Sequence, residues 1–275
     1  MATLTITTIQ ANIKWEDKEA NLAMFEERIN NINEKTEVVI LPEMFSTGFS
    51  MRPGDLAEKI NGGTINWMKK IAGEKKIILT GSIIIEEEGN YYNRLIWLLP
   101  DGRYGSYDKR HLFGYAGEND HYNPGNKRLI TSVNGWKINL QVCYDLRFPV
   151  WARQSCSTEH PGSLKQGREN SLPEYDLLIY VANWPEKRNH AWKILLQARA
   201  IENQCFVVGV NRVGTDGEGH YYSGDSMVID PFGELLYTKA HEEDVKTIVL
   251  DKNNLDEIRN KLPFLKDRDR FHIEI

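Results

Sequence analysis

Short runs of apolar residues constrain the fold of this chain more than any other feature. Residues 38–41, 77–84 and 177–183 are rich in Val, Ile and Leu. A strand has this composition when other elements cover both faces of its sheet. Segments with helical periodicity separate the runs, so the sequence predicts an α/β fold in which helices cover β-sheets.

The remaining elements follow from alternation, helical spacing and turn residues. Asp17 is placed to cap the first helix, and the longest helix is expected to turn Ile194, Leu195, Ala198 and Ile201 inward. Strands are predicted over 3–10, 91–99, 103–108, 205–210, 222–230, 235–239 and 244–250, and helices over about 18–33, 64–73, 187–204 and 252–261.

Three polar stretches are predicted to lack regular structure. Residues 46–63 and 110–127 are rich in loop-forming residues. Residues 154–173 carry no apolar period, and we interpret them as a surface insertion. We therefore expect one domain over residues 1–275 and no linker between two domains.

Composition excludes several classes of protein. The 275 residues carry a net charge of −5 without a basic stripe, so nucleic acid and anionic membranes are not expected as partners. No apolar run approaches the roughly 20 residues of a membrane span, and no signal peptide is expected. Three cysteines without a CxxC motif indicate a reducing, cytoplasmic location and no disulfide framework.

A cysteine stands at the end of a predicted strand. Residues 138–142 alternate between apolar and polar side chains, the pattern of a half-buried strand, and Cys143 follows. Pro149 cannot continue a central strand, so the chain must turn after Cys143. A thiol at such a turn lies beside unpaired backbone N–H groups that can bind an oxyanion. The alternative is that Cys143 is a small buried apolar residue.

Two further reactive groups share this placement. The run 38–41 stops at Pro42, which Glu43 follows at once, and Lys109 follows the strand 103–108. Side chains at strand ends converge on a common crevice in layered α/β folds. There a carboxylate can accept the thiol proton, and an ammonium can hold an oxyanion. Solvated surface charges are the alternative, but apolar neighbours surround both residues and favour burial with a partner.

Three motifs in this order carry a resemblance to a known family. Residues 41–45 (LPEMF), 107–113 (YDKRHLF) and 143–149 (CYDLRFP) resemble the three signatures of the nitrilase, or carbon–nitrogen hydrolase, superfamily. The resemblance covers nearly the whole chain. It implies an α-β-β-α sandwich, a Glu43–Lys109–Cys143 triad, and neither a metal nor an organic cofactor. It also implies Glu118 as a second glutamate and a homodimer or larger homo-oligomer.

Within the superfamily the chain is most similar to the bacterial omega-amidases, through residues 44–49, 109–113 and 180–185. That similarity implies hydrolysis of the terminal amide of a small 2-oxo acid, 2-oxoglutaramate or 2-oxosuccinamate, through a cysteine thioester. The backbone N–H of Tyr144 is then expected to help Lys109 hold the oxyanion. Candidate substrate-binding residues are Arg147, Asn183 and Trp184, with Lys127 and Arg128 as further cations for the substrate carboxylate.

Several alternatives stay open at this point. The chain could be another amidase of the superfamily, acting on deaminated glutathione, an N-carbamoyl compound or a nitrile, or an inactive binding homologue.

Other hypotheses concern the roles of individual side chains. Cys143 could pair with His111 or His121 in a Cys–His hydrolase, although no orienting partner for either histidine is evident. Cys143, Asp145 and His111 could suggest a metal site, but their spacing matches no zinc-binding pattern. Asp145 is expected to pair with Arg147 and fix the turn. We expect Cys156 and Cys205 to be structural or incidental.

Overall fold

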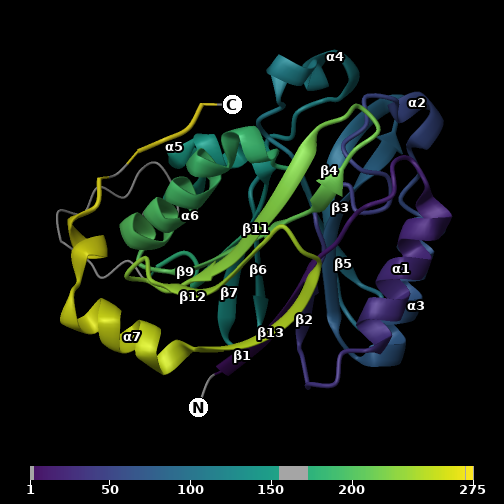
Figure 1. Cartoon of the computed structure of the whole chain (residues 1–275). Coiled ribbons are helices and arrows are strands. Elements are labelled where there is room, and N and C mark those ends of the chain that lie inside the picture. The colour runs from purple at the N-terminus through teal and green to yellow at the C-terminus, as the bar shows by residue number, and fades with distance from the viewer. Residues whose placement is uncertain (1–2, 155–172, 270, 275) are drawn as a thin grey trace.

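Two β-sheets pack face to face with helices on their outer faces (Figure 1). The structure is a computed structural model that describes residues 3–154, 173–269 and 271–274. In spatial order, the first sheet contains β13 (Asp244–Asp251), β1 (Thr3–Gln10), β2 (Val38–Ile40), β3 (Ile78–Glu87), β4 (Asn90–Leu98) and β5 (Tyr104–Asp108). The second contains β10 (Val213–Thr215), β11 (Tyr221–Ile229), β9 (Phe206–Asn211), β8 (Leu177–Ala182), β7 (Trp136–Val142) and β6 (Leu129–Val133), and β12 (Leu235–Ala240) also pairs with β11.

Long helices cover the outer faces of both sheets. α1 (Lys18–Asn30) and α3 (Gly63–Lys75) lie against the first sheet, and α6 (Asn189–Asn203) lies against the second, with α7 (Lys252–Lys261) beyond its lower edge in the view of Figure 1. Asp17 caps α1 by accepting a hydrogen bond from the N–H of Ala20 (3.0 Å). The short helices are α2 (Pro53–Leu56), α4 (Glu118–His121), α5 (Pro149–Ala152) and the 3₁₀ turns η1 (Gly114–Ala116), η2 (Cys143–Arg147), η3 (Glu186–Arg188) and η4 (Phe264–Asp267).

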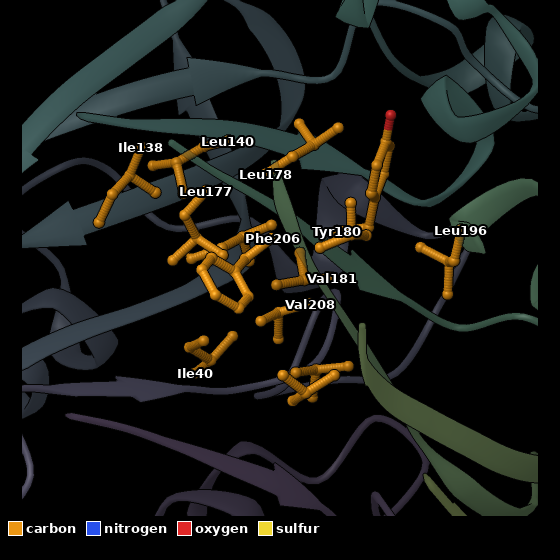
Figure 2. Close-up of a cluster of buried hydrophobic side chains, with 14 of the residues drawn as sticks. Ile40, Ile138, Leu140, Leu177, Leu178, Tyr180, Val181, Leu196, Phe206 and Val208 are labelled. Carbon is orange, nitrogen blue, oxygen red and sulfur yellow. The ribbon is translucent and has the colours of Figure 1, made fainter. Parts of the chain in front are cut away.

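The space between the sheets is an apolar core. Ile40 of β2 belongs to one buried cluster with Ile138 of β7 and with Leu177 and Val181 of β8 (Figure 2). All four side chains have no exposed surface. Full burial of each such side chain contributes about 1.5–3 kcal/mol relative to an exposed position. This core fixes the two sheets relative to each other, and therefore the strand ends that carry the reactive groups.

Strand direction brings those ends to one edge of each sheet. β2 is parallel to β3, while β4 is antiparallel to both β3 and β5. β2 and β5 therefore run the same way, and Glu43 and Lys109 follow them at the same edge. In the second sheet β7 and β8 are parallel, so Cys143 and Asn183 also follow neighbouring strand ends. The predicted α-β-β-α arrangement is confirmed.

Two predictions about burial are wrong. The strand before Cys143 is not half-buried, because Asn139 and Gln141 have no exposed surface. β7 lies between β6 and β8, and the Gln141 amide donates a hydrogen bond to Asn139 Oδ1 (3.1 Å). Polar side chains on an interior strand can thus partner each other, and alternation then does not indicate a solvent-facing side.

The prediction of which side chains of α6 point inward is also wrong. Ile194 and Ile201 are 50% and 54% exposed, whereas Trp192, Leu196 and Arg199 are buried. Arg199 lies on the inner face because its guanidinium donates a hydrogen bond to the carbonyl of Leu146 (2.6 Å). A count of apolar positions cannot detect a buried polar side chain that has a backbone partner.

The predicted loops contain some regular structure. α2 lies within 46–63 and α4 within 110–127, while β6 and β10 were not predicted. Residues 155–172 of the predicted insertion lie outside the described residues. The two described ends of that stretch are held together, because the N–H of Glu174 donates to Gln154 Oε1 (2.8 Å).

Candidate active site

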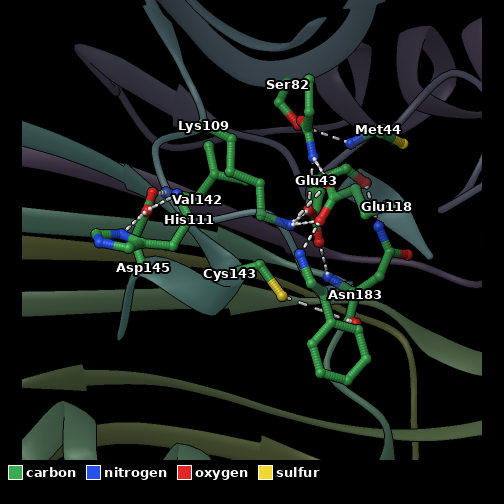
Figure 3. A network of polar contacts seen from close by, with 12 residues as sticks. Glu43, Met44, Ser82, Lys109, His111, Glu118, Val142, Cys143, Asp145 and Asn183 are labelled. Atoms are coloured by element: carbon green, nitrogen blue, oxygen red, sulfur yellow. Dashed lines mark hydrogen bonds and ion pairs between the residues drawn. The ribbon is translucent and has the colours of Figure 1, made fainter. Parts of the chain in front are cut away.

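A buried lysine lies between two buried glutamates near the ends of β2 and β5 (Figure 3). Lys109 Nζ is 2.9 Å from Glu43 Oε1 and 2.8 Å from Glu118 Oε2. None of the three side chains has exposed surface. The alternative of solvated surface charges is therefore wrong, and the cluster holds two carboxylates around one ammonium.

The carboxylate of Glu43 is fixed by both sheets. Its Oε1 also accepts a hydrogen bond from Asn93 Nδ2 (2.8 Å), and its Oε2 accepts one from the backbone N–H of Asn183 (2.7 Å). The Asn183 side chain in turn donates to the carbonyl of Glu43 (2.6 Å). Each carboxylate oxygen thus has a defined partner, and Asn183 positions Glu43.

The turn after Glu43 is strained. Met44 has a φ of 42°, an unfavourable left-handed conformation for a residue with a long side chain. Ser82 of β3 accepts a hydrogen bond from the Met44 N–H at 2.9 Å and holds this turn (Figure 3). Strain of this type persists only where the surroundings support it.

Asn93 was missed by sequence analysis. It lies in β4 with no exposed surface and donates to both Glu43 Oε1 and Glu118 Oε1 (2.8 and 3.2 Å). An asparagine within a predicted strand is the only sequence signal, and a buried amide there requires polar partners. Glu118 begins α4 instead of lying in a loop, and it also accepts the N–H of Phe113 (2.5 Å).

Cys143 begins the turn η2 with a φ of 46°. Its side chain lines the adjoining pocket, and Sγ lies 3.9 Å from the carbonyl oxygen of Asn183. Burial raises the pKa of the thiol, the charge of Glu43 raises it further, and Lys109 opposes both effects. The resting group is therefore a thiol, and it needs a base before it can attack a substrate.

The charges of the cluster are set by burial and by mutual attraction. Burial alone lowers the pKa of Lys109, but Glu118 and Glu43 outweigh this effect and the pKa is raised, so Lys109 is an ammonium. Burial raises the pKa of Glu118, although Lys109 opposes the shift. The arrangement can accept a proton and stabilise a developing negative charge at one place.

Asp145 fixes the turn, but Arg147 is not its partner. Its carboxylate accepts hydrogen bonds from the N–H of Val142 (3.0 Å), the N–H of His111 (2.9 Å) and the hydroxyl of Tyr107 (2.7 Å). It therefore ties the turn at Cys143 to the loop that carries Lys109.

The same carboxylate orients His111, which sequence analysis did not expect. His111 Nδ1 lies 2.8 Å from Asp145 Oδ1, and the imidazole stacks on Phe148 with ring centres 3.8 Å apart. The charged groups that act most strongly on Cys143 are Glu43, Lys109 and Glu118. These interactions favour Glu43 as the base that accepts the thiol proton.

Within the described residues, no three His, Cys, Asp or Glu side chains are grouped to hold a metal ion.

A cavity of about 270 Å³ opens beside Cys143. Four side chains predicted near the site line it, namely Tyr144, Arg147, Asn183 and Trp184. Trp184 is both a wall and part of the core, because its ring centre lies 5.5 Å from that of Trp192.

Two other predicted cations are not among the lining residues. Arg128 is bound to Glu174 instead (3.2 Å), and neither Arg128 nor Lys127 lines the cavity. Arg188 does line it, and sequence analysis missed this residue. The lining residues also include Phe113, Asp216, Glu218, His220 and Tyr222.

Comparison with known proteins identifies the class. The profile of the Carbon-nitrogen hydrolase family matches residues 5–260, and the chain belongs to that family. The omega-amidase YafV of Escherichia coli (strain K12) is 41% identical over 274 residues, which cover 99% of this chain and 100% of the relative. A 2-oxoglutaramate amidase of Bacillus subtilis is 29% identical and covers 96% of each chain.

Solved structures agree with the fold. XC1258 of Xanthomonas campestris, a CN-hydrolase superfamily protein, is 40% identical, covers 100% of both chains and superposes with a TM-score of 0.93. Nit3 of Saccharomyces cerevisiae is 24% identical with a TM-score of 0.80, a likeness of fold alone. The family assignment and the fold that were predicted from the three motifs are confirmed. None of the helices in the described ranges could span a membrane.

Proposed function

We propose that this chain is an omega-amidase that hydrolyses the terminal amide of 2-oxoglutaramate or 2-oxosuccinamate to the dicarboxylic keto acid and ammonia. Two relatives that align over nearly the whole chain carry the names omega-amidase and 2-oxoglutaramate amidase. The observation that carries the chemistry is Lys109, fully buried between Glu43 and Glu118 beside the Cys143 pocket.

The first half of the reaction forms a thioester. Cys143 Sγ attacks the amide carbon while Glu43 accepts the thiol proton, and Lys109 with the N–H of Tyr144 holds the oxyanion. Glu43 then gives the proton to the leaving nitrogen, the C–N bond breaks and ammonia departs. Proton transfer of this kind contributes about 10²–10⁴-fold, and each oxyanion donor about 10²–10³-fold.

The second half returns the enzyme to its starting state. Glu43, again ionised, accepts a proton from a water molecule that attacks the thioester carbonyl. The C–S bond then breaks, and the Cys143 thiolate regains the proton from Glu43. Glu118 holds Lys109 in place for both halves. One carboxylate serves twice because its protonation alternates.

Arg147 is the proposed partner of the substrate carboxylate. Its guanidinium lies 5.1 Å from the centre of the Trp184 ring at the pocket. A guanidinium stacked on an aromatic ring keeps its N–H groups directed outward, where they can bind a carboxylate with two hydrogen bonds. Asn183 and Trp184 form the wall beside it.

Ammonia release separates this function from the other amidases of the family. We expect 2-oxoglutaramate or 2-oxosuccinamate to give the highest kcat/KM in a panel with glutamine, deaminated glutathione, a simple amide, a nitrile and an N-carbamoyl compound. Higher kcat/KM for one of the other compounds would replace the proposed substrate. No release from any compound would favour an inactive binding homologue.

We further propose a single-domain, cytoplasmic enzyme that pairs as a homodimer. Ile194 and Ile201 are seven residues apart on α6 and therefore share one exposed apolar face. A Cβ atom at Gly233 would contact Ile201, which places the exposed Phe232 of the β11–β12 turn beside this face. Light scattering of the purified chain measures the oligomer, and a monomer would contradict the pairing.

A further inference from the structure

Arg188 is a second arginine at the substrate pocket. It ends the turn η3 between β8 and α6, and its guanidinium carbon lies 4.9 Å from the centre of the Phe113 ring. Like Arg147, it lines the cavity that contains Cys143. Neither guanidinium has an acidic partner among the residues that the structure describes.

The two arginines flank one wall of the pocket. The guanidinium of Arg147 lies over the Trp184 ring, and the Trp184 indole N–H donates to the backbone carbonyl of Arg188 (2.8 Å). Arg188 is also connected to the buried cluster, because the N–H of its stacking partner Phe113 donates to Glu118 Oε2. Each guanidinium therefore lies against an aromatic ring, and a hydrogen bond holds the backbone of Phe113 and the indole of Trp184.

The acidic residues of the pocket do not neutralise these arginines. Asp216 accepts hydrogen bonds from the N–H groups of Glu218 and His220 (3.0 and 2.9 Å) and from the hydroxyl of Tyr222 (2.7 Å). Its carboxylate thus holds its own loop together. Glu218 is solvent-exposed, where its charge is strongly screened. Two guanidiniums for which the described part of the chain provides no acidic partner therefore remain available for an anion.

We propose that Arg188 acts with Arg147 to bind the substrate carboxylate and thereby selects amides that carry one. This proposal rests on the amidase function proposed above. Arginine matches the planar geometry of a carboxylate, and two guanidiniums can satisfy both oxygens. An amide without a carboxylate leaves both charges unpaired and loses this interaction, so Arg188 is a specificity residue for short, singly charged amides.

The test compares Arg188→Met, Arg188→Lys and the control Lys187→Met. Lys187 is an exposed neighbour in the same turn and does not line the pocket, so its substitution removes the same charge without the contact. Each variant is assayed with 2-oxoglutaramate and with its uncharged methyl ester, and glutarate binding is measured by calorimetry.

We expect Arg188→Met to raise KM for 2-oxoglutaramate about 10- to 100-fold, the range for loss of charged hydrogen bonds. The value of kcat should change by less than about threefold, and kcat/KM for the ester should stay near that of the wild type. Glutarate binding should weaken by a similar factor, Arg188→Lys should recover part of the loss, and Lys187→Met should behave as the wild type.

Equal losses for the charged amide and its ester would show that Arg188 only supports Phe113, and an unchanged KM would also overturn the proposal. If the wild type prefers another amide, the omega-amidase function fails on its own, and the same comparison is made with the charged and esterified forms of that amide. A wild type that does not prefer a charged amide over its ester overturns the role of Arg188.

Discussion

Replacing Lys109 with Met tests whether the buried cluster depends on one cation. Lys109 is the ammonium between Glu43 and Glu118, and all three side chains are fully buried. Removing one partner of a buried ion pair costs about 3–5 kcal/mol, because an uncompensated charge is left in the interior. Met has a similar length, so the loss reflects the charge and not a large cavity.

The loss should depend on pH, and its sign follows from the carboxylates. Without Lys109 the pKa of Glu118, already raised by burial, rises further. Between its unfolded value of about 4.3 and this raised value, the folded state binds more protons than the unfolded state, so stability falls as pH rises. Lys109 itself stays charged in both states of the wild type below about pH 10, so it adds no slope there.

Urea unfolding followed by tryptophan fluorescence gives the free energy of unfolding. We expect Lys109→Met to lose about 3 kcal/mol near pH 5.5 and about 5 kcal/mol near pH 8. This difference fits one additional proton, which changes stability by at most about 1.4 kcal/mol per pH unit. A loss below about 1 kcal/mol at both pH values, or a loss that grows towards low pH, would show that Lys109 does not neutralise a buried carboxylate.

Lys70→Met is the matched control. Lys70 lies 2.9 Å from Glu26, the same separation as Lys109 from Glu43, but its side chain is 54% exposed. Solvent screens that pair, so the same substitution should have little effect on stability and none that changes between the two pH values.

Two further predictions concern the reaction. Cys143→Ala should abolish ammonia release, whereas Cys205→Ala and Cys156→Ser should retain most of it, because only Cys143 lines the pocket among the described cysteines; substantial turnover by Cys143→Ala would rule out the thioester. Dialysis against a chelator should leave the rate unchanged while a thiol alkylator removes it, since the proposed mechanism uses the Cys143 thiol and no metal ion; activity lost on chelation and restored by Zn²⁺ would point to a metal.

The reactive residues at the strand ends could be predicted from sequence because the patterns that indicate them are local. Glu43 follows a continuous apolar run and Pro42, and Lys109 follows a strand, which indicates where charged groups enter the interior. The hydrogen-bond partners of these groups could not be predicted from sequence. Asn93 lies fifty positions from Glu43 along the chain, and the two side chains meet because β3 pairs with both β2 and β4.

The errors have a common physical origin. Arg199 is buried because it binds the carbonyl of Leu146, and Asp145 binds Tyr107 and His111 instead of the nearby Arg147. Arg188 was missed because its place at the pocket depends on how the turn after β8 lies against Phe113. The tertiary structure determines which hydrogen-bond partners a buried polar group has, and the periodicity of the sequence does not indicate them.

In the proposed reaction, Glu43 activates Cys143 for attack on a 2-oxo acid amide. Glu43→Gln cannot accept the thiol proton, whereas Glu118→Gln leaves that base in place. Mass spectrometry of enzyme quenched rapidly after mixing with 2-oxoglutaramate measures the thioester on Cys143 directly. We expect the adduct in the wild type, none in Glu43→Gln, reduced but measurable adduct in Glu118→Gln, and far less adduct when glutamine replaces 2-oxoglutaramate. Adduct formation by Glu43→Gln at the wild-type rate would show that Glu43 is not the base that activates Cys143.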